Sequence, residues 1–310
     1  MRSIIFLTII VILAFITKAH DHPLVGVVSY PVSSKETLDE KYTSYIQAES
    51  VKFIESSGVR AVALKYDQDW SEHKQLLSQL NGLFVQNSFD VSMNNDPTFI
   101  GTLKSAYNYT IEQNANGDLF PLWVSGISAL QLAKLISGDK RITEKVDALD
   151  YSSGLSISET FDGNPNTYIT HKIKHNFLRY AYEDNSVYFN QDYAITLDIF
   201  KGSELEEDFE IVAQAKDRKG KDFVAMLKSK RYPIILSFTL FEAVYNFYPE
   251  NNVPHSSEST KLAVQFSKVF TNICRLNDRM FPTVADEFAN NIFNNPLTVV
   301  TEPEYQTFYF

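Results

Sequence analysis

In the first part of the chain, segments with the apolar pattern of a strand alternate with segments that have the apolar spacing of a helix. Short apolar runs typical of buried strands occur at residues 24–28, 59–64 and 83–85. Helical spacing of apolar positions occurs between them, over 41–57, where Gly58 ends the segment, and again after Asp69, which has Glu72 three residues on as in a capping box. The order strand, helix, strand, helix, strand predicts an α/β fold with a parallel sheet between layers of helices.

The pattern changes in the second half of the chain. Strand-like runs cover residues 187–189, 193–200, 209–216 and 223–228, and Asp217-Arg218-Lys219-Gly220 is a hairpin turn. An apolar run over 234–241, followed by Glu242, is typical of a strand buried on both faces, and 261–275 is a final amphipathic helix. We therefore expect a three-layer α/β sandwich with a mostly parallel central sheet and an antiparallel extension before its last core strand.

One strand, tight turn and helix follow each other closely in the middle of the chain. The strand is expected at 119–123, the turn at 124–128 and the helix at 129–137, ended by Gly138. Parallel sheets place their sites at the carboxyl ends of strands, so this turn is where functional residues are expected. It has the form of a nucleophile elbow, but Gly126 at its centre carries no nucleophile.

Charge and composition narrow the function classes. The 310 residues carry 28 basic and 38 acidic side chains, a formal net charge of −10, with no block of like charges. This distribution argues against nucleic acid or an anionic membrane as a partner.

The first 19 residues have the features of a signal peptide. Arg2 precedes an apolar run over 4–16, and Thr17-Lys18-Ala19 supplies small residues for cleavage. The run is shorter than the roughly 20 residues that span a bilayer, although an uncleaved anchor is the alternative. We expect a signal peptide at 1–19, one domain over 20–310, no membrane attachment after cleavage, and an extracellular or lysosomal/vacuolar location.

Two further features bear on that compartment. Cys274 is the only cysteine, so no intramolecular disulfide is available. Asn108 begins the sequon Asn108-Tyr109-Thr110 and is the expected glycosylation site.

Several segments together resemble the γ-glutamyl hydrolases, a family of class I glutamine-amidotransferase-like peptidases with a flavodoxin-like fold. The resembling segments are, in chain order, YIQAESVKFIESSG at 45–58, Asn81-Gly82, FPLW at 120–123, LQLAKLISG at 130–138 and Arg231-Tyr232-Pro233. They cover about residues 24 to 280. The resemblance implies a cysteine-type peptidase that removes γ-linked glutamates from folate polyglutamates, with no cofactor.

At the positions that the resemblance assigns to catalysis, the chain has lost the reacting groups. The family's elbow, Trp-Gly-Thr-Cys-Leu-Gly, places its nucleophilic cysteine on Gly126, and the family's catalytic histidine falls on Leu240. Only the acidic member survives, as Glu242. The family's Gly-Gly oxyanion turn falls near Gln86-Asn87-Ser88, and a further family histidine falls on Asn190.

These losses remove the mechanism, because glycine has no atom to attack a carbonyl and leucine cannot carry a proton. Removal of a protease triad slows acyl transfer by about 10⁶-fold, or roughly 8 kcal/mol in the barrier. Ser125 or Ser128 could substitute as a nucleophile, although capping of the helix start is the simpler interpretation. Cys274, in the final amphipathic helix, is expected to be a buried thiol.

Metal binding is not expected. His20-Asp21-His22 belongs to a new N-terminus after cleavage, and His171 and His175, four residues apart, have no acidic or cysteine partner nearby.

We therefore expect a pseudoenzyme whose cleft, formed by Ser125, Ser128, Gln86, Asn87 and Asn190, binds a γ-glutamyl or folate-like molecule or a protein partner. Two alternatives stay open: an active γ-glutamyl hydrolase with atypical residues, and a structural or assembly subunit such as a homodimer.

Overall fold

The structure is a computed structural model that describes residues 21–32, 42–88, 95–139, 141–158, 180–183, 185–246, 252–301 and 304–310. The expected signal peptide at 1–19 lies outside the described residues, as do His20, His171 and His175.

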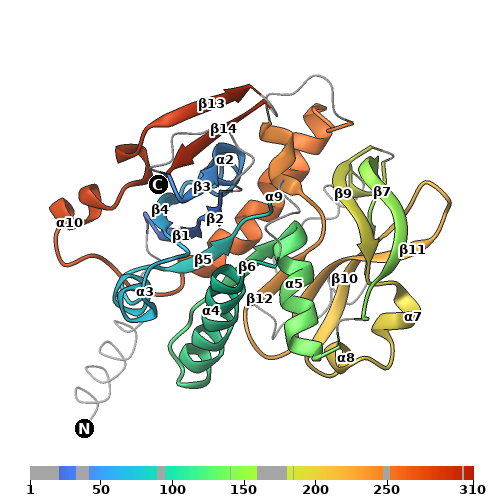
Figure 1. The fold of residues 1–310 in the computed structure, drawn as a ribbon, viewed down its shortest axis with the longest axis horizontal. Coiled ribbons are helices and arrows are strands. Elements are labelled where there is room, and N and C mark those ends of the chain that lie inside the picture. The colour runs from blue at the N-terminus through green and yellow to red at the C-terminus, as the bar shows by residue number, and fades with distance from the viewer. Residues whose placement is uncertain are drawn as a thin grey trace, which may run out of the picture.

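An eight-stranded sheet forms the centre of the fold (Figure 1). Five parallel strands lie in the order β4 (Arg60–Leu64), β1 (Leu24–Val28), β5 (Gly82–Val85), β6 (Leu122–Ser125) and β12 (Ile234–Ser237). Three antiparallel strands continue it: β11 (Asp222–Ser229), β10 (Phe209–Lys216) and β8 (Ser156–Ile157). This topology confirms the mostly parallel sheet and its antiparallel extension.

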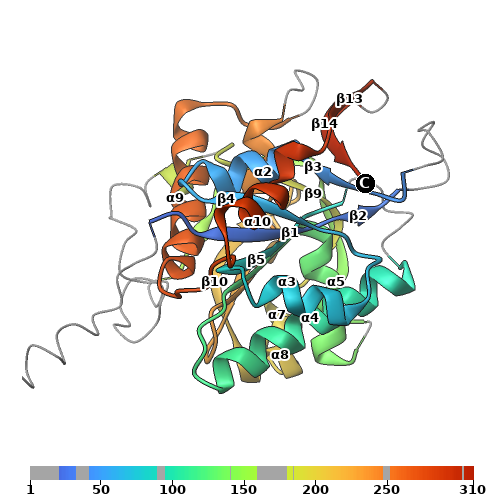
Figure 2. The same ribbon diagram turned by 90° about the vertical axis from the view of Figure 1, so that its left-hand side faces the viewer.

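Helices cover both faces of that sheet (Figure 2). The helices α2 (Ala48–Glu55) and α9 (Ser257–Cys274) pack on one face, and α3 (Trp70–Leu77), α4 (Pro97–Ala115) and α5 (Gly126–Ser137) pack on the other. Successive side chains of a strand point to opposite faces, so on β5 Phe84 joins the first core while Leu83 and Val85 join the second. The fold is the expected three-layer α/β sandwich, and both faces of its parallel strands are apolar because both are covered.

Two smaller sheets flank this core (Figure 1). A two-stranded antiparallel sheet pairs β7 (Glu144–Ser153) with β9 (Val187–Ala194), beside α5. A four-stranded sheet has the order β13 (Leu297–Thr301), β14 (Glu304–Tyr309), β3 (Ser44–Gln47) and β2 (Tyr30–Pro31). The remaining short helices are α7 (Leu197–Phe200), α8 (Glu204–Asp208), η3 (Phe241–Tyr245), α10 (Val284–Ala289) and η4 (Ile292–Asn294).

The helix expected over 41–57 is wrong in its first part. Residues Ser44–Gln47 form strand β3, and the helix begins only at Ala48. The strand forms because β14, about 260 residues further along the chain, pairs with it and places Phe308 opposite Ile46. Pairing with a distant strand therefore overrides the local helical spacing.

Two other expected strands differ from the structure. The run at 193–200 divides into the end of β9 and one helical turn, α7, because Thr196 crosses to bridge Phe223 of the central sheet. The run at 234–241 is a strand only as far as Ser237, after which η3 begins at Phe241. Helix α4, which the apolar pattern did not indicate, has Pro97 in its first turn and is capped by Asp96, whose carboxylate accepts a 2.8 Å hydrogen bond from Phe99 N.

Within the described part of the chain, no helix has both the length and the apolar character needed to cross a bilayer.

Candidate functional site

Gly126 stands at a sharp turn between strand and helix. It follows Ser125, the last residue of β6, and is the first residue of α5. Its φ of +57° lies in the left-handed region, where a side chain at the end of a strand is turned out of the sheet. The backbone thus has the form of a nucleophile elbow, and the residue at its apex has no side chain to present.

The space that an apex side chain would need is already filled. An ideal Cβ built on Gly126 would lie 2.5 Å from Asn87 Cγ and 2.7 Å from Leu240 Cδ2, closer than real Cβ atoms approach other groups. Asn87 follows β5, and Leu240 follows β12. The structure therefore brings together the three positions that the sequence assigned to nucleophile, base and oxyanion turn, and they pack against one another.

Asn87 also forms a hydrogen bond with the backbone amide directly after the apex residue. Its Oδ1 accepts a 2.9 Å hydrogen bond from the backbone N–H of Ile127. In elbow hydrolases, this amide at the start of the helix is one that stabilises the oxyanion. Here it is bound to a side chain of the same protein, which is itself only 3% exposed.

Ser125 and Glu242 form a buried pair below the apex. Ser125 Oγ donates a 2.5 Å hydrogen bond to Glu242 Oε1, and both residues are almost fully buried. Burial raises the pKa of Glu242 to about 7, against the smaller, opposing effect of the Ser125 hydroxyl. The serine hydroxyl is thus committed to a carboxylate in the core and is not directed into an open cleft.

Glu49 is a second buried acid that the sequence analysis did not single out. Burial raises its pKa well above the ordinary value, and the negative charge of Glu242 raises it further. The start of α2 is buried, and Glu49 is a charged residue there between Ala48 and Ser50. A charged residue within a buried segment is the feature that could have identified Glu49 as a candidate. The interior beside the elbow thus holds two interacting carboxyl groups, and burial favours the protonated form of each.

Ser128 and Gln86 also form internal contacts. Ser128 Oγ donates to the Gln86 carbonyl at 2.7 Å, and Gln86 Nε2 donates to the Tyr45 carbonyl at 2.8 Å. Gln86 Oε1 accepts from Gln47 N at 2.8 Å. These bonds tie the elbow to β3, so the structure places both residues in the framework of the site, away from solvent.

Asn190 lies in a different environment, at an open cavity of about 660 Å³. The cavity is lined by Ile127, Leu130, Gln131, Lys134, Arg141, Thr143, Leu149, Asn190, Gln191, Asp192 and Tyr193. Asn190 Oδ1 accepts a 3.2 Å hydrogen bond from Asp150 N. Of the cleft residues expected from sequence, Asn190 alone belongs to this cavity, which begins beside the elbow at Ile127.

The other candidate residues lie apart from the site. Asn108 is exposed on α4, whereas the sequon's Thr110 is buried and donates to the Ala106 carbonyl. Cys274 is buried in α9, and burial raises its pKa far above the ordinary value. Among the residues that the structure describes, no three His, Cys, Asp or Glu side chains are grouped as a metal site would require.

The chain is similar to known proteins along most of its length. Residues 23–114 match the model of the peptidase C26 family. The chain is 26% identical to γ-glutamyl hydrolase B of Dictyostelium discoideum over 313 residues, which cover 98% of this chain and 87% of that protein. It is 24% identical to the γ-glutamyl hydrolase of Homo sapiens, with 86% and 81% covered.

Similar solved structures include the glutaminase domain of Trypanosoma brucei CTPS, with a TM-score of 0.48 and 11% identity over 84% of this chain and 96% of that one. PurLQS from Thermotoga maritima has a TM-score of 0.44 and 14% identity, over 81% and 97%.

Proposed function

We propose that the protein is a non-catalytic member of the γ-glutamyl hydrolase family, which it resembles along most of its length, and that it is a pseudoenzyme of the secretory pathway that binds a ligand without hydrolysing it. The observation that carries this proposal is the contact of Asn87 and Leu240 with the space above Gly126. A missing nucleophile could in principle be replaced by a neighbouring group. A space filled by the protein's own side chains leaves no room for the acyl group on which such a replacement would act.

The hydrogen bonds around the apex support the same conclusion. An active hydrolase needs an accessible hydroxyl or thiol beside a base, and free amides for the oxyanion. Ser125 and Ser128 are fully buried, so a substrate does not reach either hydroxyl, and Ser128 donates to a backbone carbonyl, which is not a base. The Ile127 amide is bound to Asn87.

The test is hydrolysis by the purified secreted protein of a γ-glutamyl chain, such as a poly-γ-glutamyl folate, followed by mass spectrometry. We expect no product above the rate without enzyme. Ser125→Ala and Ser128→Ala variants accompany the wild type. Cleavage that one of these variants abolishes would establish a surrogate serine and contradict the proposal.

The secretory location is supported by the N-terminal sequence. Sequencing of the protein released from expressing cells is expected to start at His20, directly after Ala19. A protein that starts at Met1 and stays on membranes would show that the N-terminal segment is an uncleaved anchor and not a cleaved signal peptide.

A second candidate function, a subunit of a homodimer, is favoured by a concentration of exposed apolar side chains. In the described residues, six of the eleven large apolar side chains that are exposed belong to a 20-residue stretch: Met280, Val284, Phe288, Phe293, Leu297 and Val299. The last two lie on β13, an edge strand. Sedimentation analysis of wild type and a Phe288→Lys variant tests it, with a dimer that dissociates in the variant as the expected result. A monomeric wild type contradicts it.

A further inference from the structure

A second cavity lies between α3 and the segment that contains α10. Its volume of about 390 Å³ falls in the usual range for ligand pockets, roughly 300–1,000 Å³. One wall is formed by a face of α3 and the residues next to it, and the other wall is formed by residues between 281 and 290. Figures 1 and 2 show α3 and α10 next to each other, near the β4 edge of the central sheet. This cavity shares no lining residue with the cavity beside the elbow.

Core contacts hold the α10 segment against the body of the protein. Before α10, Arg279 Nη1 donates to the Leu77 carbonyl of α3 at 3.0 Å, and Phe281 is only 6% exposed within the apolar core on that face of the sheet. After α10, Ile292 is fully buried in the core of the opposite face. Both ends of the segment are thus fixed, so the two walls of the cavity belong to the folded framework.

Side chains that both donate and accept hydrogen bonds predominate in the lining. Four of the nine lining residues carry a carboxamide: Gln68, Gln75, Gln79 and Asn290. Glu72 and Gln75 lie three residues apart on α3 and therefore share one face, about one helical turn of 5.4 Å from each other. A row of polar groups at this spacing can bind several polar atoms of one small molecule.

Most of these groups are available to a ligand. Among the residues that the structure describes, the side chains of Gln68, Glu72 and Gln75 form no hydrogen bond or ion pair. On the facing wall, the carboxylate of Asp286 accepts one bond of 2.7 Å, from Thr283 Oγ1 to its Oδ2. Both walls therefore present hydrogen-bonding groups that the described part of the protein does not use.

The chemistry of the lining favours a neutral ligand that is rich in hydroxyl groups. Glu72 and Asp286 are the only charged residues among the described residues that line the cavity, and both are acidic, so an anion is repelled. An ammonium ion would pair with the two carboxylates, but it only donates, so the N–H groups of the four amides would gain no acceptor from it. A hydroxyl group both donates and accepts, and it can pair with amides and carboxylates alike.

Apolar surface lies beside these polar groups. Leu76 is half-buried on α3, Pro282 is exposed on the facing segment, and Phe281 lies buried between the walls. A pyranose ring has hydroxyl groups around its edge and C–H groups on its faces. Its two kinds of surface therefore match the two kinds of surface in the cavity.

We propose that this cavity binds a neutral hexopyranose. Its hydroxyl groups pair with Glu72 and Gln75 of α3 and with Asp286 on the facing wall, and its C–H face packs on Leu76 and Pro282. The inference does not rest on the proposed function, because the cavity and the elbow share no residue.

The test is a ligand-observed NMR titration of the full secreted protein with the methyl pyranosides of glucose, galactose and mannose, which differ in the directions of their hydroxyl groups. We expect saturable binding of at least one of them, with a Kd of about 1 mM, as is usual for a small neutral ligand in an open cavity. The matched uronic acid has a carboxylate in place of the hydroxymethyl group. It should bind several-fold more weakly, because Glu72 and Asp286 repel it.

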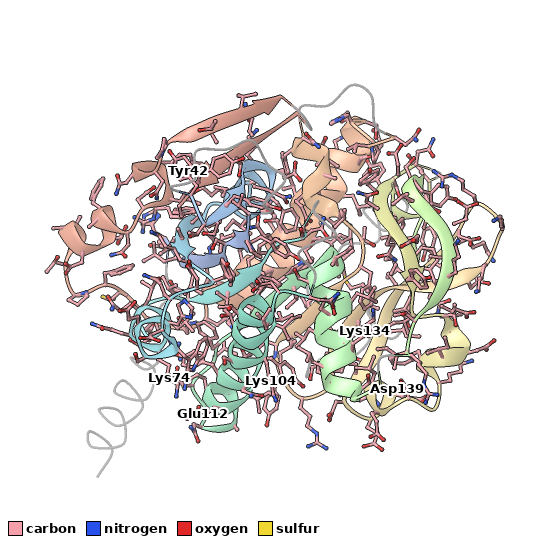
Figure 3. The ribbon with its side chains drawn as sticks, viewed as in Figure 1. Tyr42, Lys74, Lys104, Glu112, Lys134 and Asp139 are labelled. Carbon is pink, nitrogen blue, oxygen red and sulfur yellow. The ribbon has the colours of Figure 1, made fainter. Side chains whose placement is uncertain are left out.

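Two alanine substitutions locate the site. Glu72→Ala and Gln75→Ala should each weaken binding by about tenfold, since each removes a hydrogen bond to the sugar. Gln75 is exposed and its side chain has no partner among the described residues, so the melting temperature of this variant should equal that of wild type. Glu112→Ala is the matched control, at an exposed glutamate of α4 that Figure 3 labels outside this cavity, and should leave the affinity unchanged.

Three outcomes overturn the inference. The first is no saturable binding of any of the three glycosides up to about 50 mM. The second is equal affinity in Gln75→Ala and wild type, which would place the sugar elsewhere on the protein. The third is binding of putrescine, a diammonium compound without hydroxyl groups, in a protein that binds none of the glycosides, which would show that the carboxylates alone select the ligand.

Discussion

Asn87 Oδ1 accepts a hydrogen bond of 2.9 Å from the backbone N–H of Ile127, the amide directly after the apex of the elbow. A carboxamide of the protein therefore lies against the amide to which a hydrolase of this form would bind the carbonyl of its substrate. The contact satisfies two buried polar groups at once, and it requires glycine at position 126. The four predictions that follow test this arrangement and the core around it.

Two glycines with similar positive φ angles allow the energetic cost of the contact with Asn87 to be measured. Gly126 and Gly138 have φ values of +57° and +65°, but a Cβ on Gly138 would meet nothing within 4 Å. Gly138→Ala should cost about 1–2 kcal/mol of unfolding free energy, from left-handed strain alone. Gly126→Ala should cost about 1–3 kcal/mol more, because the methyl group overlaps Asn87.

Urea denaturation measures both losses. Asn87→Gly introduced into the Gly126→Ala protein should recover part of its stability, as expected for two residues in contact. Equal losses at the two glycines would mean that Asn87 does not fill the apex.

Restoration of catalysis should need three substitutions and not two. A protein with Gly126→Cys and Leu240→His regains nucleophile and base, but Asn87 still overlaps the apex and binds the Ile127 amide. We expect this double variant to be inactive. Addition of Asn87→Gly frees both the space and the amide, and should give a covalent acyl-enzyme detectable by mass spectrometry together with γ-glutamyl hydrolysis.

Asn87→Gly alone is the control and should be inactive. Activity in the double variant equal to that of the triple variant would show that Asn87 moves aside without cost.

Stability should depend on pH through Glu242. Its pKa is raised from 4.5 to about 7 by burial, so the folded state binds a proton that the unfolded state has already released. The stability that this proton supplies is fully present below about pH 4.5 and is lost as pH rises through 7. The shift corresponds to at most about 3 kcal/mol.

Glu242→Gln keeps an acceptor for Ser125 and removes the charge. The variant should equal wild type near pH 4.5 and exceed it in unfolding free energy near pH 8. His73 acts in the opposite direction below pH 6.5, because burial lowers its pKa, so the measured quantity is the difference between variant and wild type. Parallel pH profiles of the two proteins would contradict the prediction.

Substitution of Asn81, a buried polar residue of the core, should cost a large amount of unfolding free energy. Its Oδ1 accepts from Leu24 N at 2.7 Å, and its Nδ2 donates to Asn277 Oδ1 at 2.7 Å and to the Arg279 carbonyl at 3.0 Å. Asn81→Ala removes these bonds from the core and should cost about 2–4 kcal/mol of unfolding free energy.

Chemical denaturation of Asn81→Ala beside Asn290→Ala checks this. Asn290 makes one exposed bond, to the Asp286 carbonyl, and its loss should cost less than about 0.5 kcal/mol. An equally small loss of unfolding free energy at Asn81 and Asn290 would contradict the prediction that the hydrogen bonds of Asn81 stabilise the core.

The sequence by itself determined most of the order of the elements and the side chains that stand at the elbow. Strand β1 and the strand pair β10–β11 with its Asp217–Gly220 turn follow from local periodicity and turn residues, which act over a few positions. The absence of a nucleophile at Gly126 and of a base at Leu240 follows from side-chain chemistry alone, once the elbow is located.

Tertiary structure decided what packs around the elbow. Strand β3 exists because a strand from the other end of the chain pairs with it, and Asn87 fills the apex because three loops meet there. Each depends on atoms brought together from distant parts of the chain. Local sequence determines the apolar periodicity of a segment and the chemical groups that it carries. The contact partner of a buried group is determined only when the layers of the fold pack together.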